Sequence, residues 1–164
     1  MTPLITRRPI VAAVAERLTG VTNATGYVGA IGAMNGLPGV TNTPAQPPAK
    51  SADDKRVQPY FVLYPGVGGP VEEEDLADTL VDIDYPVAIT AAAGDVNDLL
   101  ALVDRITALL WRWAPTDLPS VAGRAVVAGP LRYPPGYAPP LLTDAAFTPA
   151  RQYTQLQFVT TVHT

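Results

Sequence analysis

Several residue types on which enzymes depend are missing or scarce in this chain of 164 residues. Cysteine is absent, which excludes disulfide bonds, thiol nucleophiles and thiolate metal sites. The single histidine, His163, is the second-last residue, a poor position for a catalytic histidine, which a third group must hold firmly. Serine occurs only at Ser51 and Ser120. These absences argue against an enzyme, and we expect no cofactor.

Basic residues are fewer than acidic residues in this sequence. Eleven Lys and Arg residues stand against fifteen Asp and Glu residues, which gives a formal net charge of −4. A protein that binds nucleic acid regardless of sequence needs a surplus of Lys and Arg to neutralise phosphates. Anionic lipid headgroups would repel an acidic chain. We therefore expect neither a nucleic-acid-binding protein nor a membrane-bound one.

Long apolar runs are also lacking, since none approaches the roughly 18 residues that span a membrane. The amino-terminal region has one feature of an export signal, because Arg7 and Arg8 precede an apolar stretch over residues 10–15. Glu16 and Arg17 interrupt that stretch too early for a signal peptide. The pattern favours an amphipathic helix, and with it a soluble protein made in a cytoplasm.

Glycine and proline, in contrast, are abundant, at 13 and 18 residues. Ten of the 18 prolines lie over residues 33–57 and 130–149, and the second region holds six of them. Loops of about 20 residues in a compact domain are usually functional or disordered. The length otherwise suits one domain. We therefore predict a single domain over residues 1–164, with a long loop at 33–57 and a Pro-rich extended arm at 130–149.

Two segments carry the clearest secondary-structure signals. Over residues 83–91, apolar and polar residues alternate, which predicts a strand with one buried face. Pro86 cannot donate to a strand ladder, so we expect the strand to be bulged or at a sheet edge there. Asp95 is a good helix N-cap, and apolar residues then repeat at helical spacing as far as residue 113. The predicted apolar stripe is Val96, Leu99, Leu100, Val103, Ile106, Leu110 and Trp113.

The other predicted elements rest on shorter patterns. They are a helix over residues 8–19, a bulged strand over 25–32, a buried strand over 59–64, a strand over 121–131 and a long strand over 151–162. Strands grouped with only two helices favour an α+β fold. We expect one mixed or antiparallel sheet of about five strands, with both helices on one face.

Two short motifs could carry chemistry, and for both a structural interpretation is favoured. Residues 66–70 have the glycines of a phosphate loop but lack its Lys and its Ser or Thr, and four acidic residues follow closely, so we expect a turn. Asp82 and Asp84 put two carboxylates on one strand face, as in the divalent metal site of a hydrolase. A solvated acidic strand start is favoured, because no base, nucleophile and orienting group occur together.

Aromatic residues outside the predicted buried faces are candidate contact residues. Trp111 lies off the helical stripe, so it either covers a neighbouring element or marks a contact surface. Tyr133 and Tyr137 stand in the Pro-rich arm, where aromatic side chains favour a contact role. The alternative is that the arm packs back on its own domain.

The order of these elements resembles that of the tail terminator, or tail completion, proteins of long-tailed phages and of related small head–tail joining proteins. The resemblance rests on the helix from Pro9 to Leu18, the strand over 59–64, the strand over 85–90 that leads into the helix over 95–113, and the final long strand. It covers most of the chain outside the loop and the arm. The long Pro-rich insertions depart from the family pattern.

The resemblance implies a structural virion protein without catalysis. Its subunits are expected to form a ring of six that caps the tail tube, ends tail polymerisation and joins the tail to the head connector. The implied partners are other copies of the chain, the tail tube protein and the connector or stopper protein, with genome DNA only passing through the central hole. Assembly would take place in the host cytoplasm, and the protein would reside in the tail or neck of the virion.

Physical requirements of such a ring suggest which residues would serve it. A heterologous contact needs two different complementary patches on one subunit, and extended arms can reach a neighbour by strand addition. Negative charge around the hole would keep DNA from sticking during passage. The predicted lumen residues are Glu72, Glu73, Glu74 and Asp75. The predicted subunit or tube interface residues are Trp111, Arg124, Arg132, Tyr133, Tyr137 and Arg151.

The sequence leaves other functions open. The nearest alternative is another neck, connector or minor tail protein of a phage, which shares the same structural class. A more distant one is a metal-dependent hydrolase centred on Asp82 and Asp84. An unrelated soluble interaction domain is the last.

Overall fold

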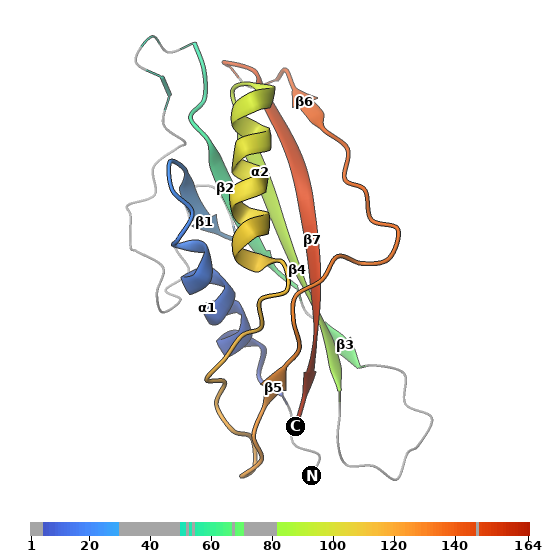
Figure 1. Cartoon of the computed structure of the whole chain (residues 1–164). Coiled ribbons are helices and arrows are strands. Elements are labelled where there is room, and N and C mark those ends of the chain that lie inside the picture. The colour runs from blue at the N-terminus through green and yellow to red at the C-terminus, as the bar shows by residue number, and fades with distance from the viewer. Residues whose placement is uncertain are drawn as a thin grey trace.

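The computed structural model describes residues 5–29, 50–51, 53, 55–66, 68–70, 82–146 and 148–164 (Figure 1). Its helices are α1 (Arg7–Leu18) and α2 (Val96–Leu110). Its strands are β1 (Thr25–Val28), β2 (Tyr60–Pro65), β3 (Gly69–Pro70), β4 (Ile83–Ala93), β5 (Val127–Ala128), β6 (Leu142–Asp144) and β7 (Arg151–His163). Within these residues, no helix combines the length and the hydrophobicity needed to cross a membrane.

The fold is α+β, with two helices and a mixed, strongly curled sheet. The strands follow the order β1-β2-β4-β7-β5, while β3 pairs with β4 and β6 pairs with β7. β1 is parallel to β2, and the other strand pairs of the described sheet are antiparallel. The long strands β4 and β7 run side by side (Figure 1). The predicted fold class is confirmed.

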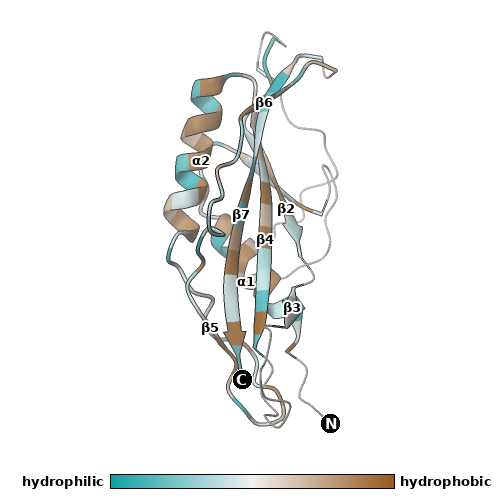
Figure 2. Ribbon diagram, turned by 90° about the vertical axis from the view of Figure 1, so that its right-hand side faces the viewer, coloured by the Kyte–Doolittle hydropathy of each residue, from teal (hydrophilic) through white to brown (hydrophobic). Residues whose placement is uncertain are grey.

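Alternation along the two long strands directs one face of the sheet into the core. On β4, the buried side chains Ile83, Tyr85, Val87, Ile89 and Ala91 alternate with more exposed ones. On β7, Leu156, Phe158, Thr160 and Val162 are buried in the same way. Apolar side chains of both helices join this cluster, and Figure 2 shows α2 standing off one face of the sheet. We call this the helix face and the opposite one the far face.

The long helix α2 buries a narrower stripe than the sequence predicts. Asp95 caps it as predicted, its Oδ1 accepting a hydrogen bond from the Asp98 backbone N–H at 2.9 Å. The buried side chains are Leu99, Leu102, Ile106 and Leu110. Val96 and Leu100, which the prediction placed in the stripe, are 42% and 51% exposed. They lie on the flank of the helix, outside the line of contact with the sheet.

The helix also ends three residues earlier than predicted, at Leu110. Trp111 has an extended backbone, and Arg112 has a φ of 60°. The chain then pairs with the Pro-rich arm, since the Arg112 N–H donates to the Leu131 carbonyl (3.0 Å) and the Leu131 N–H donates to the Trp113 carbonyl (2.8 Å). Tertiary hydrogen bonds therefore replace the last turn of helix that the apolar repeat suggests.

Pro86 lies in the interior of the sheet, so of the two expected positions the sheet edge is wrong. The pairing toward β2 and β3 is irregular, as a bulge requires, because three residues between Pro65 and Gly69 face two residues of β4. On the other side its partner is Val159 of β7. Val159 exchanges both backbone hydrogen bonds with Arg132, at 2.8 and 3.0 Å, so it is not bonded toward β4. A donor at residue 86 would therefore point toward β2 and β3, where the pairing with β4 breaks between Val87 and Asp84. The proline occupies a position where no ladder bond is lost.

The Pro-rich arm packs along β7 instead of extending freely. The strand predicted over 121–131 is reduced to β5 and a tight bridge between Val121 and Arg124. Beyond β5, Arg132 pairs with Val159, and β6 pairs with the start of β7. The arm is therefore an interrupted antiparallel strand on this edge. The described part of the predicted extended arm thus packs on its own domain, which is the alternative that the sequence left open.

The amino-terminal half of the sheet agrees with the sequence where it is described. The predicted helix over 8–19 is α1, and the predicted strands over 59–64 and 25–32 correspond to β2 and, in part, to β1. Most of the predicted loop at 33–57 falls outside the described residues. Its last part returns to the domain through a bridge between Lys50 and Val57.

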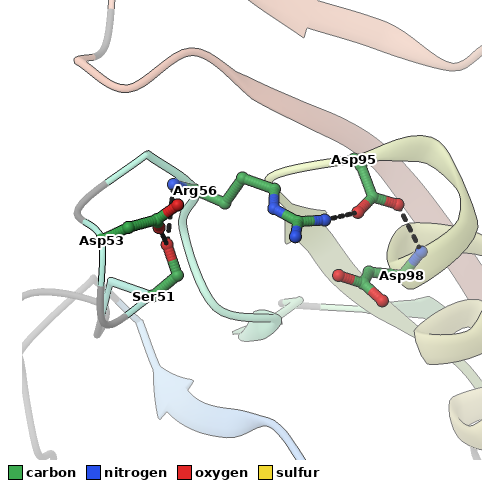
Figure 3. A network of polar contacts seen from close by, with 5 residues as sticks. All are labelled: Ser51, Asp53, Arg56, Asp95 and Asp98. Atoms are coloured by element: carbon green, nitrogen blue, oxygen red, sulfur yellow. Dashed lines mark hydrogen bonds and ion pairs between the residues drawn. The ribbon is translucent and has the colours of Figure 1, made fainter.

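A polar network ties this returning segment to the start of α2 (Figure 3). The Arg56 guanidinium lies 2.9 Å from the Asp95 carboxylate, and the Arg56 N–H donates to the Ser51 hydroxyl at 3.0 Å. The Gly94 N–H donates to the Val57 carbonyl at 2.9 Å. A Cβ at Gly94 would lie 2.9 Å from Val57 backbone atoms, so only glycine permits this approach.

Proline should be tolerated at residue 86 but not two residues later. The Leu63 carbonyl accepts from the Gly29 N–H, so the next residue, Tyr64, is bonded toward its partner Ala88. Ala88→Pro removes that donor and should lower the free energy of unfolding by about 1–3 kcal/mol. Pro86→Ala should change it by less than about 0.5 kcal/mol. Urea denaturation measures both, and similar losses would contradict the ladder described above.

The N-cap of α2 should make the free energy of unfolding fall measurably at acid pH. Hydrogen bonds, first from the Asp98 backbone N–H and then from Arg56, hold the pKa of Asp95 below 3.8. Because the folded-state pKa is depressed, the ionised carboxylate stabilises the fold fully above the unfolded-state pKa. This contribution is lost as the pH falls through the folded-state pKa. Asp95→Asn keeps a cap acceptor without the charge. The stability difference between wild type and variant should shrink below about pH 4, and a difference independent of pH would refute this.

Candidate functional site

Three aromatic side chains form a band beside β7. Trp111 follows the end of α2, and Tyr133 and Tyr137 belong to the arm. The Tyr133 ring centroid lies 4.9 Å from that of Trp111 and 6.3 Å from that of Tyr137. The sequence predicted all three as contact residues, and the structure brings them together. We call these three residues the aromatic band.

Tyr133 fixes the aromatic band to the core. Its ring stacks on Phe158 of β7, with the centroids 4.9 Å apart and the planes at 24°. Its hydroxyl lies 3.1 Å from the Thr107 hydroxyl of α2. Leu131, two residues earlier, is fully buried. The arm thus joins the helix to the sheet, and Tyr133 is first of all a packing residue.

The two ends of the band differ. Trp111 remains 41% exposed although it packs on Tyr133, and the Arg112 guanidinium lies 5.9 Å from its ring. The Tyr137 hydroxyl donates to the Gln155 carbonyl. Burial, and to a lesser degree the neighbouring Tyr133, raises the pKa of Tyr137. Trp111 therefore covers a neighbouring element and still offers surface, which joins the two interpretations left open by the sequence.

A groove lies on the far face of the sheet, next to Tyr137. It has a volume of about 570 Å³. Its lining residues are Tyr64, Thr90, Tyr137, Pro140, Leu142, Tyr153 and Gln155. Tyr64 and Leu142 are 39% and 43% exposed. We call this the far-face groove.

Sequence reasoning missed the far-face groove, although a signal for it was present. Along β2, Tyr60, Val62 and Tyr64 alternate with residues of the main core. The strand pairing places Tyr153 of β7 on the same face of the sheet as these three residues. Tyr60, Val62 and Tyr153 belong to a second, smaller apolar cluster. The continuous apolar run over residues 59–64 predicts only a buried strand, so it does not reveal that this strand has a second apolar face.

Exposed apolar side chains also mark the opposite side of the subunit. Val96 and Leu100 of α2 and Trp111 just beyond it are each more than 40% exposed. From Val96 to Leu100 is one helical turn, and from Leu100 to Trp111 is three turns. The three side chains therefore lie on one flank of the helix. We call them the α2 strip.

Arg151, predicted as an interface residue, is engaged inside its own domain. Its side chain is only 16% exposed, and Nη2 and Nε lie 2.9 and 3.1 Å from Oδ2 of Asp144. Its Nη1 donates to the Tyr60 hydroxyl. Burial nevertheless raises the pKa of Tyr60, because desolvation of the phenol outweighs the nearby cation. Arg151 therefore clamps β6 and β2 to the start of β7.

The other two arginines lie apart from each other. Arg132 is on the far face, where it donates to the Thr161 hydroxyl at 3.3 Å and lies 3.8 Å from the Asp84 carboxylate. Its side chain is 48% exposed. Arg124 lies in the tight bridge with Val121, and its side chain points into solvent. Neither one belongs to the aromatic band.

The paired carboxylates considered for a metal site are held by protein groups. Oδ1 of Asp84 accepts from the Thr161 hydroxyl at 2.6 Å, and Oδ2 of Asp82 lies 2.9 Å from Nδ1 of His163. No three His, Asp or Glu side chains of the described chain come together as metal ligands would. Both carboxylates are therefore engaged by side chains of β7.

The glycine-rich segment over 66–70 is part turn and part strand. Gly68 has a φ of 69°, which favours glycine, and Gly69–Pro70 form β3 against the start of β4. The residues that follow it, 71–81, lie outside the described residues. The predicted lumen residues Glu72, Glu73, Glu74 and Asp75 lie outside the described residues.

Comparison with known proteins does not add a relative. No model of a protein family matches the chain, and no curated protein matches it either.

Truncation of Tyr133 should detach the arm, whereas removal of its hydroxyl should not. Tyr133→Phe loses only the contact with Thr107 and should cost about 0.5–1.5 kcal/mol of unfolding free energy. Tyr133→Ala also loses the stacking on Phe158 and should cost about 3–5 kcal/mol. Denaturant titrations followed by tryptophan fluorescence compare the two. Equal, small losses would show that the arm does not depend on this residue.

Proposed function

We propose that the chain is a structural subunit of a phage tail, forming a ring that caps the tail tube, ends tail polymerisation and joins the tail to the head connector. The ring would hold six copies, and its partners would be the tail tube protein and the connector or stopper protein. DNA would only pass through the central hole. The site described above would serve assembly, without catalysis or a cofactor.

The order and packing of the elements support this proposal. The amino-terminal helix, the strand β2, the strand β4 leading into α2 and the final long strand β7 carry the resemblance to tail terminator proteins. In the structure these elements form one layered unit, with both helices on a single face of the sheet. The Pro-rich arm, which departs from that family pattern, lies against the unit without breaking it.

The observation that carries the proposal is the presence of two unlike apolar surfaces on opposite sides of one chain. The α2 strip is a convex helix flank, and the far-face groove is a concavity on the other side of the sheet. Exposed apolar surface of this kind marks interaction sites. Two different patches on one subunit are what a heterologous ring contact needs.

The proposal predicts an effect on tail tubes at low stoichiometry. Purified tail tube protein from the same virus would be polymerised with and without the chain, at about one ring equivalent per tube. We expect tubes that are shorter and carry extra density at one end, measured by negative-stain electron microscopy. The physical reason is that a ring on the growing end blocks the next layer of tube subunits.

The matched control for this experiment is Val127→Ser. Val127 is 58% exposed and lies in β5, which pairs with the last residues of β7, whereas the groove lies beside Tyr153 and Gln155. This variant should therefore cap tubes as the wild type does. Tubes of unchanged length with no density at their ends would contradict the terminator function. Binding to a purified head connector without binding to tubes would favour another neck protein instead.

A further inference from the structure

We propose that the α2 strip of one copy docks in the far-face groove of the next copy. The docked α2 would run in the same direction as the α2 that covers the other face of that sheet. This contact rests on the ring of the proposed function and names the surfaces that build it. It is a contact between two copies of this chain, related head to tail. The argument depends on shape, on hydrogen-bonding character and on the spacing of charges.

The shapes of the two surfaces match. Leu100, at 51% exposure, projects from the middle of the α2 strip with Val96 one turn before it. The far-face groove offers about 570 Å³ between the arm and the strands β2, β4 and β7, which is within the range of pockets that bury small apolar groups. A helix flank can therefore enter the groove with its apolar side chains first.

The polar groups of the two surfaces also match. Asp104, on the exposed side of α2, lies one turn beyond Leu100. Among the described residues, those that line the groove include no carboxylate, and the hydroxyls of Tyr64, Thr90 and Tyr153 can donate hydrogen bonds there. A carboxylate beside Leu100 therefore meets donors and no like charge.

The spacing of charges fixes the direction of the docked helix. α2 ends at Leu110, about 15 Å beyond Leu100 along the helix axis, and Arg112 follows two residues later. On the far face, Asp84 is opposite Thr161 of β7, which lies about 20 Å along the strand from Gln155 in the groove. The Asp84 side chain is 47% exposed. With Leu100 in the groove, the Arg112 guanidinium can approach the Asp84 carboxylate only when the docked helix runs parallel to β7.

That direction is also the one α2 takes on its own sheet. β4 leads into α2, which folds back over the sheet antiparallel to β4 and so parallel to β7. In the assembly, each sheet would lie between its own α2 and that of a neighbour, both pointing the same way. Such a contact uses a different patch on each partner, so it repeats from copy to copy until a ring closes.

Cysteine cross-linking tests the contact directly, because the chain has no cysteine of its own. The double variant Leu100→Cys/Leu142→Cys would be treated with a short bis-maleimide. We expect a ladder of covalent dimers, trimers and larger species on a denaturing gel. Each single variant should give no ladder, because one cysteine per chain can join at most two copies. The matched control Val127→Cys/Leu142→Cys should also give none.

Mixing of charge variants provides a second measurement that does not depend on the reach of a cross-linker. Leu100→Arg and Leu142→Arg change exposed residues, so both should fold and both should be monomers. An equimolar mixture should give only a one-to-one dimer, since one intact strip and one intact groove remain. The proposed contact is wrong if either charge variant assembles like the wild type. It is also wrong if the Leu100→Cys/Leu142→Cys variant gives no more cross-linked species than its control.

The two proposals fail in distinguishable ways. Tubes that are capped equally well by Leu100→Arg would leave the terminator function in place and overturn the contact. A cross-linked ladder from a chain that never affects tubes would establish the contact and overturn the function.

Discussion

The pairing of β4 with β7 is the interaction on which the rest of this structure depends. The register runs from Ile83 opposite Val162 to Ala93 opposite Gln152 without a break. Because side chains alternate, this one register decides which residues build the core and which form the far face. A slip of one residue would turn the buried set of one of the two strands, such as Phe158 of β7, to the far face and remove part of the packing surface for the helices. The helices, the arm and the far-face groove all take their positions from it.

The arm and the proline in β4 show how the sheet manages its hydrogen bonds. An edge of β7 left bare would be a template for further strands. Here β5, Arg132 and β6 cover it at intervals, and prolines fill the gaps where no donor is required. Strand addition to this edge is therefore blocked. Assembly by strand addition through the arm is therefore not expected, and the contact that we propose uses the side-chain surfaces of the α2 strip and the far-face groove.

Local patterns in the sequence predict the fold better than they predict the site. The alternation over 83–91, the Asp95 cap and the final strand identify the central elements, because each is set by residues near one another in the chain. The position of Pro86, the end of α2 and the path of the arm depend on Val159 and Leu131, which are distant in sequence. The far-face groove escaped prediction for the same reason, since Tyr64 and Leu142 meet only through the tertiary fold. The ion pair between Arg151 and Asp144 could not be predicted either, because an arm rich in prolines gives no sign of where Asp144 will lie.

The central claim is that this chain builds a closed ring from two unlike faces of one subunit. The most direct measurement is the mass of the untagged wild-type protein in solution, by mass photometry and light scattering over a wide concentration range. The account predicts one dominant species near six times the 17.3 kDa mass of the chain, with no growth beyond it. A protein that stays monomeric at every concentration, or that grows without limit into filaments, would contradict it.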